Sequence, residues 1–184
     1  MYQFRLTLDH GLIEEDCSVE KIILIFLRIG KYPQLKNGFF LQMDKHIELG
    51  IAEMNLFIML GSAGLSHELF NERLFPIGTV YDPFIARGLD ALNYACYQDA
   101  RFIIVGTPSG VSLAPEGGAH QSIGTPLTGR SQPGLLSFEP AFADELSIMM
   151  NYSFNYLQDE NGGSVYIRLS TRSIDQPSRE LTKD

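Results

Sequence analysis

A short run of apolar residues at 102–107 (FIIVGT) constrains the fold of this chain more than any other feature. Polar and apolar side chains do not alternate in it, which is typical of a strand buried on both faces of a parallel sheet. Other strands are expected at 77–81, 135–138 and 164–170, and helices at 51–65, 84–97 and 140–157. Alternating strands and helices imply parallel pairing with right-handed crossovers. The sequence therefore predicts an α/β layered fold with a mainly parallel sheet flanked by helices.

The 184 residues divide by character into three parts. Residues 1–45 form an atypical, charged lead-in with one apolar stretch, residues 46–172 carry the alternating pattern of one domain, and residues 173–184 are expected to be a tail or the start of a linker. In folds of this class, ligands bind beyond the carboxyl ends of the strands. A loop rich in Gly, Pro and Ser is predicted at 108–133, directly after the buried strand. This loop is the first place to look for chemistry.

The charge balance argues against several classes of partner. Lys and Arg total 14 against 22 Asp and Glu, giving a net charge of −8, whereas nucleic acid and anionic membranes attract basic surfaces. No apolar run approaches the roughly 20 residues that span a bilayer, and no secretory leader pattern opens the chain. Cys17 and Cys96 have neither disulfide nor metal-ligand spacing, so we expect buried or idle thiols. These features favour a cytoplasmic protein.

Glu53 is the first candidate for a chemical role. It is the one charged residue between Leu49 and Ser66, in a helix that is apolar on nearly every side and is therefore expected to be buried. A buried carboxylate is costly unless it is paired, hydrogen-bonded or protonated, and such carboxylates concentrate at functional sites. The alternative is a Glu in the first helical turn that only favours the helix dipole.

The loop at 108–133 contains the second candidate, the segment EGGAHQ. Glu116 and His120 would share a face if the segment were helical, and they could form a proton-transfer pair or part of a metal site. No third ligand lies at a suitable spacing, so proton transfer is the better interpretation, and a surface histidine without a role is the alternative. Asp82, followed by Pro83, is expected to cap the helix after it. The sequence contains no dinucleotide fingerprint, phosphate loop or nucleophile elbow.

Four segments follow one another in the chain: HIELGIAEMN (46–55), PIGTVYDPF (76–84), RFIIVGTPSG (101–110) and APEGGAHQS (114–122). Together they resemble the pyrimidine-binding domain of thiamine-diphosphate enzymes of the transketolase and 2-oxoacid dehydrogenase group. Within this group, the segments are most similar to the single-chain, homodimeric type of pyruvate dehydrogenase first component. The resemblance covers residues 46–172, about two thirds of the chain.

The resemblance implies a role for each candidate residue. Glu53 would hydrogen-bond the pyrimidine ring nitrogen and favour the imino tautomer, whose amine nitrogen removes the thiazolium proton. Tyr81 and Phe84 would flank the pyrimidine, with core packing as the alternative. His120 would handle charge and protons on the substrate adduct, and Glu116 would help to position cofactor or substrate.

The resemblance also implies partners. In these enzymes Mg²⁺ and the diphosphate are held by a separate domain marked by a G-D-G segment and a later Asn, and this sequence has no G-D-G segment. A diphosphate-binding domain or subunit would complete the site in a homodimeric enzyme. Such an assembly would decarboxylate pyruvate and pass the acetyl unit to a lipoyl acetyltransferase component. The alternatives are transketolase-type ketol transfer between sugar phosphates, and a truncated fragment or interaction module without catalysis. Exposed apolar surface is expected where partner domains pack.

Overall fold

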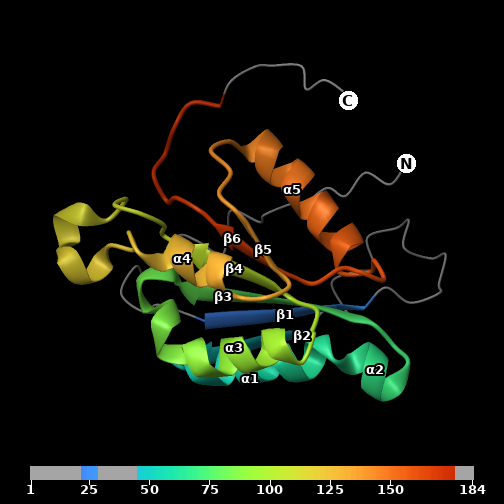
Figure 1. The fold of residues 1–184 in the computed structure, drawn as a ribbon. Coiled ribbons are helices and arrows are strands. Elements are labelled where there is room, and N and C mark those ends of the chain that lie inside the picture. The colour runs from blue at the N-terminus through green and yellow to red at the C-terminus, as the bar shows by residue number, and fades with distance from the viewer. Residues whose placement is uncertain (1–21, 29–44, 177–184) are drawn as a thin grey trace.

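The computed structural model describes residues 22–28 and 45–176, and their strands form one six-stranded sheet with the order β2-β1-β3-β4-β6-β5 (Figure 1). In chain order the elements are β1 (Ile22–Arg28), β2 (Lys45–Gly50), α1 (Glu53–Gly64), α2 (Ser66–Phe70), β3 (Leu74–Tyr81), the 3₁₀ helix η4 (Asp82–Gly88), α3 (Leu89–Tyr97), β4 (Ile103–Thr107), the 3₁₀ turns η5 (Ala114–Glu116) and η6 (Gly118–His120), α4 (Thr125–Ser131), β5 (Leu135–Phe138), α5 (Ala143–Tyr156) and β6 (Ser164–Arg168).

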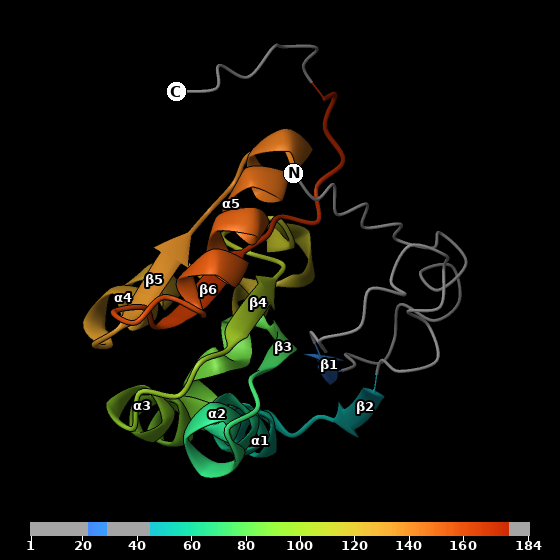
Figure 2. The ribbon, with the colours of Figure 1, turned by 90° about the vertical axis from the view of Figure 1, so that its right-hand side faces the viewer.

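The parallel part of the sheet confirms the predicted fold class. β3 pairs with β4, β4 with β6, and β6 with β5, all in parallel. α1 and α3 lie on one face of the sheet and α5 lies on the other (Figures 1 and 2). β4, the strand of the apolar run, lies between two parallel neighbours and is buried along most of its length. None of the helices in the described ranges is long and apolar enough to cross a membrane.

The other edge of the sheet is antiparallel and was not predicted. β1 pairs antiparallel with both β2 and β3, so the sheet takes one strand from the range that the sequence assigned to the lead-in. β2 is a short edge strand in which the polar residues His46 and Glu48 alternate with Ile47 and Leu49. These two apolar side chains pack against the core beneath α1, whereas Glu48 between them is exposed. The two-residue alternation that indicates such a strand is present, but it spans too few residues to stand out.

The core consists of two clusters, one on each face of the sheet. The larger cluster lies between the sheet and α1 with α3, and includes Leu56, Phe57 and Leu60. The smaller cluster lies beneath α5, around Leu157. Gly78 of β3 lets α1 approach the sheet closely, because a Cβ there would lie 2.7 Å from Leu60 and 2.9 Å from Leu56.

The prediction that the first helix is buried on nearly all sides was wrong. One side of α1 packs on β3, but Met54 and Ile58 on α1 and Ile51 just before it are exposed, at 38%, 53% and 64%. A helix on the outer layer of a sheet contacts the core along one stripe, so its remaining apolar side chains stay at the surface.

Two predicted segments differ from the structure in their internal organisation. The expected helix at 84–97 is divided at Gly88 into η4 and α3, and a Cβ at Gly88 would lie 2.8 Å from the Glu53 carbonyl oxygen of α1. The expected loop at 108–133 contains α4, whose Thr, Pro and Gly residues are typical of loops. A Cβ at Gly129 would clash with the Ser137 hydroxyl, so α4 depends on glycine to pack on β5.

Candidate functional site

The structure brings the candidate residues to the carboxyl end of β3 and the loop after β4. Tyr81 is the last residue of β3 and pairs in register with Thr107, the last residue of β4. The loop that carries Glu116 and His120 therefore leaves the sheet beside Tyr81, as expected for parallel strands. Phe84 lies in η4 directly after β3.

His120 contacts two of the other candidates through one ring nitrogen. The Tyr81 hydroxyl lies 2.6 Å from His120 Nδ1, and the two rings have centroids 6.0 Å apart. Glu116 Oε2 lies 3.7 Å from the same nitrogen. The side chains of His120 and Glu116 are 32% and 56% exposed, so the group lies at the surface of this chain. A tyrosine hydroxyl in hydrogen-bond contact with an imidazole nitrogen, with a carboxylate nearby, orients the ring, and a proton-transferring histidine requires such a fixed orientation.

Arg87 connects the aromatic residues to Glu53 and was missed by the sequence analysis. The Tyr81 and Phe84 rings meet edge to face with centroids 5.0 Å apart, and the Arg87 guanidinium lies 3.7 Å from the Phe84 centroid. Arg87 Nη1 in turn lies 3.4 Å from Glu53 Oε1. Phe84 and Arg87 stack because side chains three positions apart eclipse each other in a 3₁₀ helix. That spacing was visible in the sequence, but the segment was interpreted as an α-helix.

Glu53 is 6% exposed and is the first residue of α1. It is thus buried and paired, as one interpretation required, and it also lies in the first turn, where the helix dipole favours a carboxylate. Its partner Arg87 has a side chain that is 52% exposed, and the 3.4 Å separation is longer than an ordinary charged hydrogen bond.

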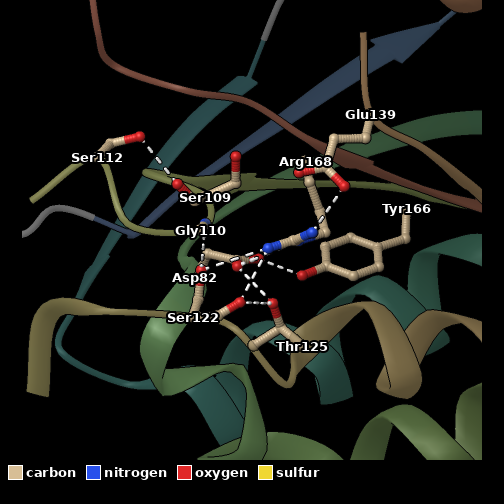
Figure 3. A network of polar contacts seen from close by, with 9 residues as sticks. All are labelled: Asp82, Ser109, Gly110, Ser112, Ser122, Thr125, Glu139, Tyr166 and Arg168. Carbon is tan, nitrogen blue, oxygen red and sulfur yellow. Dashed lines mark hydrogen bonds and ion pairs between the residues drawn. The ribbon is translucent and has the colours of Figure 1, made fainter. Parts of the chain in front are cut away.

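A buried polar network lies next to this line of contacts (Figure 3). Asp82, which is fully buried, accepts hydrogen bonds from Thr125 Oγ1 at 2.7 Å, from Arg168 Nε at 3.3 Å and from the Tyr166 hydroxyl. The prediction that Asp82 caps the following helix was wrong, because no side-chain cap bond forms at the start of η4. A carboxylate at this position instead neutralises a buried arginine from β6.

Arg168 donates to three partners in different segments. Besides Asp82, it donates from Nη1 to Glu139 Oε2 at 2.8 Å and from Nη2 to the Ser122 carbonyl oxygen at 2.9 Å. Its side chain is 4% exposed. Sequence reasoning could have found it, because an arginine in a strand predicted to be buried requires a buried acceptor.

Two buried groups stay protonated. Burial and then the charge of Asp82 raise the pKa of the Tyr166 hydroxyl well above its usual value, so Tyr166 remains a donor in the network. Burial raises the pKa of the Cys96 thiol to about 11, which makes it an inert core side chain at neutral pH. Cys17 lies outside the described residues.

Other parts of the described chain show no competing centre. Within residues 22–28 and 45–176, no three His, Cys, Asp or Glu residues gather so that they could hold a metal ion. A cavity of about 320 Å³ lies near the amino end of β4, away from the candidates, and its lining includes His67, Arg73 and Arg101. The last turn of α1 and the end of α3 border this cavity, so its arginines face the negative ends of two helix dipoles.

Comparisons with known proteins agree with the resemblance seen in the sequence, although no protein-family model matches the chain. Over 111 residues, 59% of this chain and 12% of the relative, the sequence is 27% identical to the "Pyruvate dehydrogenase E1 component" of Mycobacterium tuberculosis. The solved structure "Split gene transketolase, inactive beta4 tetramer" has 26% identity and a TM-score of 0.50, over 72% of this chain and 40% of that chain. The chain thus spans less than half the length of either protein.

Proposed function

We propose that this chain, which resembles the transketolase-like domain of thiamine-diphosphate enzymes in sequence and fold, supplies the pyrimidine-binding half of such an active site. The observation that carries the proposal is the continuous line of contacts from Glu53 through Arg87, Phe84 and Tyr81 to His120. Residues from three separate segments of the chain meet there, at the sheet edge where α/β folds bind ligands.

The donor set fits an aminopyrimidine ring. Such a ring is flat and carries nitrogen atoms at its edge, so it requires aromatic neighbours for its faces and a hydrogen-bonding carboxyl for a ring nitrogen. Tyr81 and Phe84 supply the aromatic neighbours, and Glu53 supplies the carboxyl group from a buried position. The low exposure of Glu53 matters because a hydrogen bond to a carboxyl group is stronger where water is excluded.

Thiamine diphosphate, when bound, supplies carbanion chemistry that amino-acid side chains lack. The role of Glu53 is to hold the pyrimidine nitrogen in the tautomer that this chemistry requires. His120 then moves protons at the substrate carbonyl oxygen, using an imidazole whose Nδ1 is held by Tyr81 and Glu116. Arg87 keeps Glu53 and Phe84 aligned through its two contacts.

The diphosphate and Mg²⁺ are assigned to a partner domain or subunit, because the sequence holds no G-D-G segment. Two apolar side chains next to Glu53 in the chain are exposed, those of Ile51 and Met54, and they give such a partner a surface to cover. Within this assembly we propose pyruvate as the substrate, with transfer of the acetyl unit to a lipoyl group. Ketol transfer between sugar phosphates is the second candidate, and the similarity to a split-gene transketolase favours it.

The test uses the complex that copurifies with the tagged chain from the cells that produce it. Release of labelled carbon dioxide from carboxyl-labelled pyruvate is measured with thiamine diphosphate and Mg²⁺ added, and a ketose phosphate is offered as the alternative donor. Glu53→Gln is expected to lower turnover by about 100-fold or more, in the range of general acid–base contributions. Glu68→Gln on α2, an exposed site, is the matched control and should leave turnover unchanged.

Three outcomes would contradict the proposed function or replace part of it. Full turnover in Glu53→Gln would contradict the role of Glu53. Turnover with a ketose phosphate and none with pyruvate would replace the decarboxylase by a ketol transferase. No turnover with either donor in a complex that contains a diphosphate-binding subunit would leave an interaction module.

A further inference from the structure

The polar network around Arg168 joins the two segments that carry Tyr81 and His120. Asp82 directly follows Tyr81 in the chain, and Ser122 lies two residues after His120. We infer that Arg168 is a positioning residue, which holds Tyr81 and His120 in hydrogen-bonding register by binding Asp82 on one side and Ser122 on the other. Figure 3 shows the Arg168 guanidinium in contact with both residues.

The support for Arg168 is rigid. β6 lies between β4 and β5 in the parallel sheet, and every residue of the strand is buried. Arg168 is its last residue, so the guanidinium leaves the sheet at the edge where β3 and β4 also end. A side chain carried by an inner strand of a sheet keeps its neighbours in place better than one carried by a loop.

The shape of the guanidinium explains why an arginine occupies this position. Nε donates to Asp82, Nη1 to Glu139 and Nη2 to the Ser122 carbonyl oxygen, so three donors of one planar group fix three segments. A lysine ammonium carries the same charge but lacks this fork. Thr125 closes the network, because its hydroxyl lies 2.7 Å from Asp82 Oδ2 and 2.9 Å from the Ser122 carbonyl oxygen.

The contacts of Arg168 and Thr125 fix the distance between Tyr81 and the loop that carries His120. The bridge between Gly110 and Ser122 closes the loop on itself, with the Ser122 amide donating to the Gly110 carbonyl at 2.9 Å, but it does not bind η4. Thr125 and Arg168 provide contacts between Ser122 and Asp82. The 2.6 Å contact between Tyr81 and His120 spans 39 positions of sequence, and a shift of about 1 Å between the two segments would break it.

The test reads the His120 ring directly in the purified full-length chain. With histidine labelled by ¹⁵N, the Nδ1 resonance of His120 is recorded in the unmodified chain, in Tyr81→Phe and in Arg168→Lys. We expect Arg168→Lys to move this resonance in the same direction as Tyr81→Phe and by at least half as much. His67, exposed on α2, serves as the internal reference for the Tyr81 and Arg168 variants.

A matched control separates positioning from general stability. Arg101 is also buried, near the amino end of β4, and Arg101→Lys should lower the melting temperature while leaving His120 unchanged. If Arg168→Lys fails to fold, Thr125→Val disturbs the same path from the Asp82 side and should move the His120 resonance. The inference is overturned if Arg168→Lys folds and its His120 resonance is unchanged. The same holds for Thr125→Val where that variant is used instead.

The inference rests on the proposed function only for the importance of His120. The spectroscopic measurement needs neither cofactor nor partner, so the two proposals fail separately. A resonance that moves in Arg168→Lys, combined with full turnover in Glu53→Gln, would leave the positioning role standing and remove the proposed activity.

Discussion

Two arginines are buried in the described part of the chain, one near each end of the parallel strands, and their surroundings differ. Arg168, at the carboxyl end, binds the fully buried Asp82, a backbone carbonyl and Glu139. Arg101, at the amino end, donates to the Asp159 carbonyl at 3.2 Å and to Asp99 at 3.4 Å. The Asp99 side chain is 71% exposed, so water stabilises its charge as well.

The difference indicates where the fold tolerates buried charge. Near the amino end, Arg101 donates to a backbone carbonyl oxygen and to a solvent-exposed carboxylate. Neither acceptor depends on another buried side chain. At the carboxyl end, Tyr166, Thr125 and Arg168 all donate to Asp82, so the loss of any one of these four side chains takes at least one hydrogen bond from another member of the network. Such a network is sensitive to substitution but fixes geometry, and it lies beside the candidate site.

The largest expected effect comes from replacing each of the two buried arginines by methionine. Arg168→Met should lower the free energy of unfolding by about 3–5 kcal/mol, because it removes the cation that pairs with the fully buried Asp82 side chain. Arg101→Met should cost only about 1–2 kcal/mol, since its carboxylate partner is solvated. Urea denaturation of the two variants checks the order, and an equal or greater cost for Arg101→Met would contradict the comparison.

A backbone position tests how tightly the carboxyl-end network is packed. A Cβ at Gly106 would overlap the Asp82 carboxylate and lie 2.9 Å from Tyr166 Cε2. Gly106→Ala should therefore cost about 1–3 kcal/mol, because neither the strand nor the network can move freely. Gly118→Ala is the control, since a Cβ there meets nothing within 4 Å and should change stability by less than about 0.5 kcal/mol. Thermal unfolding of both variants decides whether the network can relax.

For two buried serines, the larger loss of stability is expected at the amino end of the strands, which is the opposite of the order expected for the arginines. At the amino end, the Ser164 hydroxyl accepts from the Phe102 amide at 3.0 Å and donates to the Ala100 carbonyl at 2.6 Å. Ser164→Ala should cost about 2 kcal/mol, because it removes a partner from two buried backbone groups. Ser122→Ala should cost about 1 kcal/mol, since Arg168 keeps its bond to the Ser122 carbonyl oxygen. Equal costs in denaturant titrations would mean that the carboxyl end depends on every one of its hydroxyls.

The sequence predicted those parts of the fold that have a local signal. The strands at β4, β5 and β6 and the helix at α5 follow from short-range apolar patterns and turn residues. α4 was missed because Thr, Pro and Gly form it, and its stability comes from the close contact of Gly129 with β5. β1 was missed because its partners β2 and β3 follow it in the chain, and an antiparallel edge cannot be assigned from one strand alone.

The candidate site was predictable wherever one residue stands out from its neighbours. Glu53 is a single charge in an apolar segment, and His120 is the one histidine of a Gly-rich loop. The contacts between them were not predictable, because Tyr81 and His120 lie 39 positions apart and Asp82 and Arg168 lie 86 positions apart. No local spacing encodes such pairs, so Arg87 and Arg168 emerged only from the structure. The roles assigned to Glu53, Tyr81, Phe84, Glu116 and His120 remain predictions.

The smallest expected effect concerns the exposed partner of each arginine. Asp99→Asn removes a charge 3.4 Å from Arg101 and keeps a residue type that tolerates the positive φ of 62° at this position. It should change the free energy of unfolding by less than about 0.5 kcal/mol, as an exposed ion pair contributes little. Glu139→Gln, opposite Arg168, should cost below about 1 kcal/mol for the same reason, since the Glu139 side chain is 56% exposed. Urea titrations at low and high salt measure both costs. A cost for Glu139→Gln that approaches that of Arg168→Met would assign the stability of the carboxyl end to its outer charge, and the buried Asp82 would then no longer explain why the two ends differ.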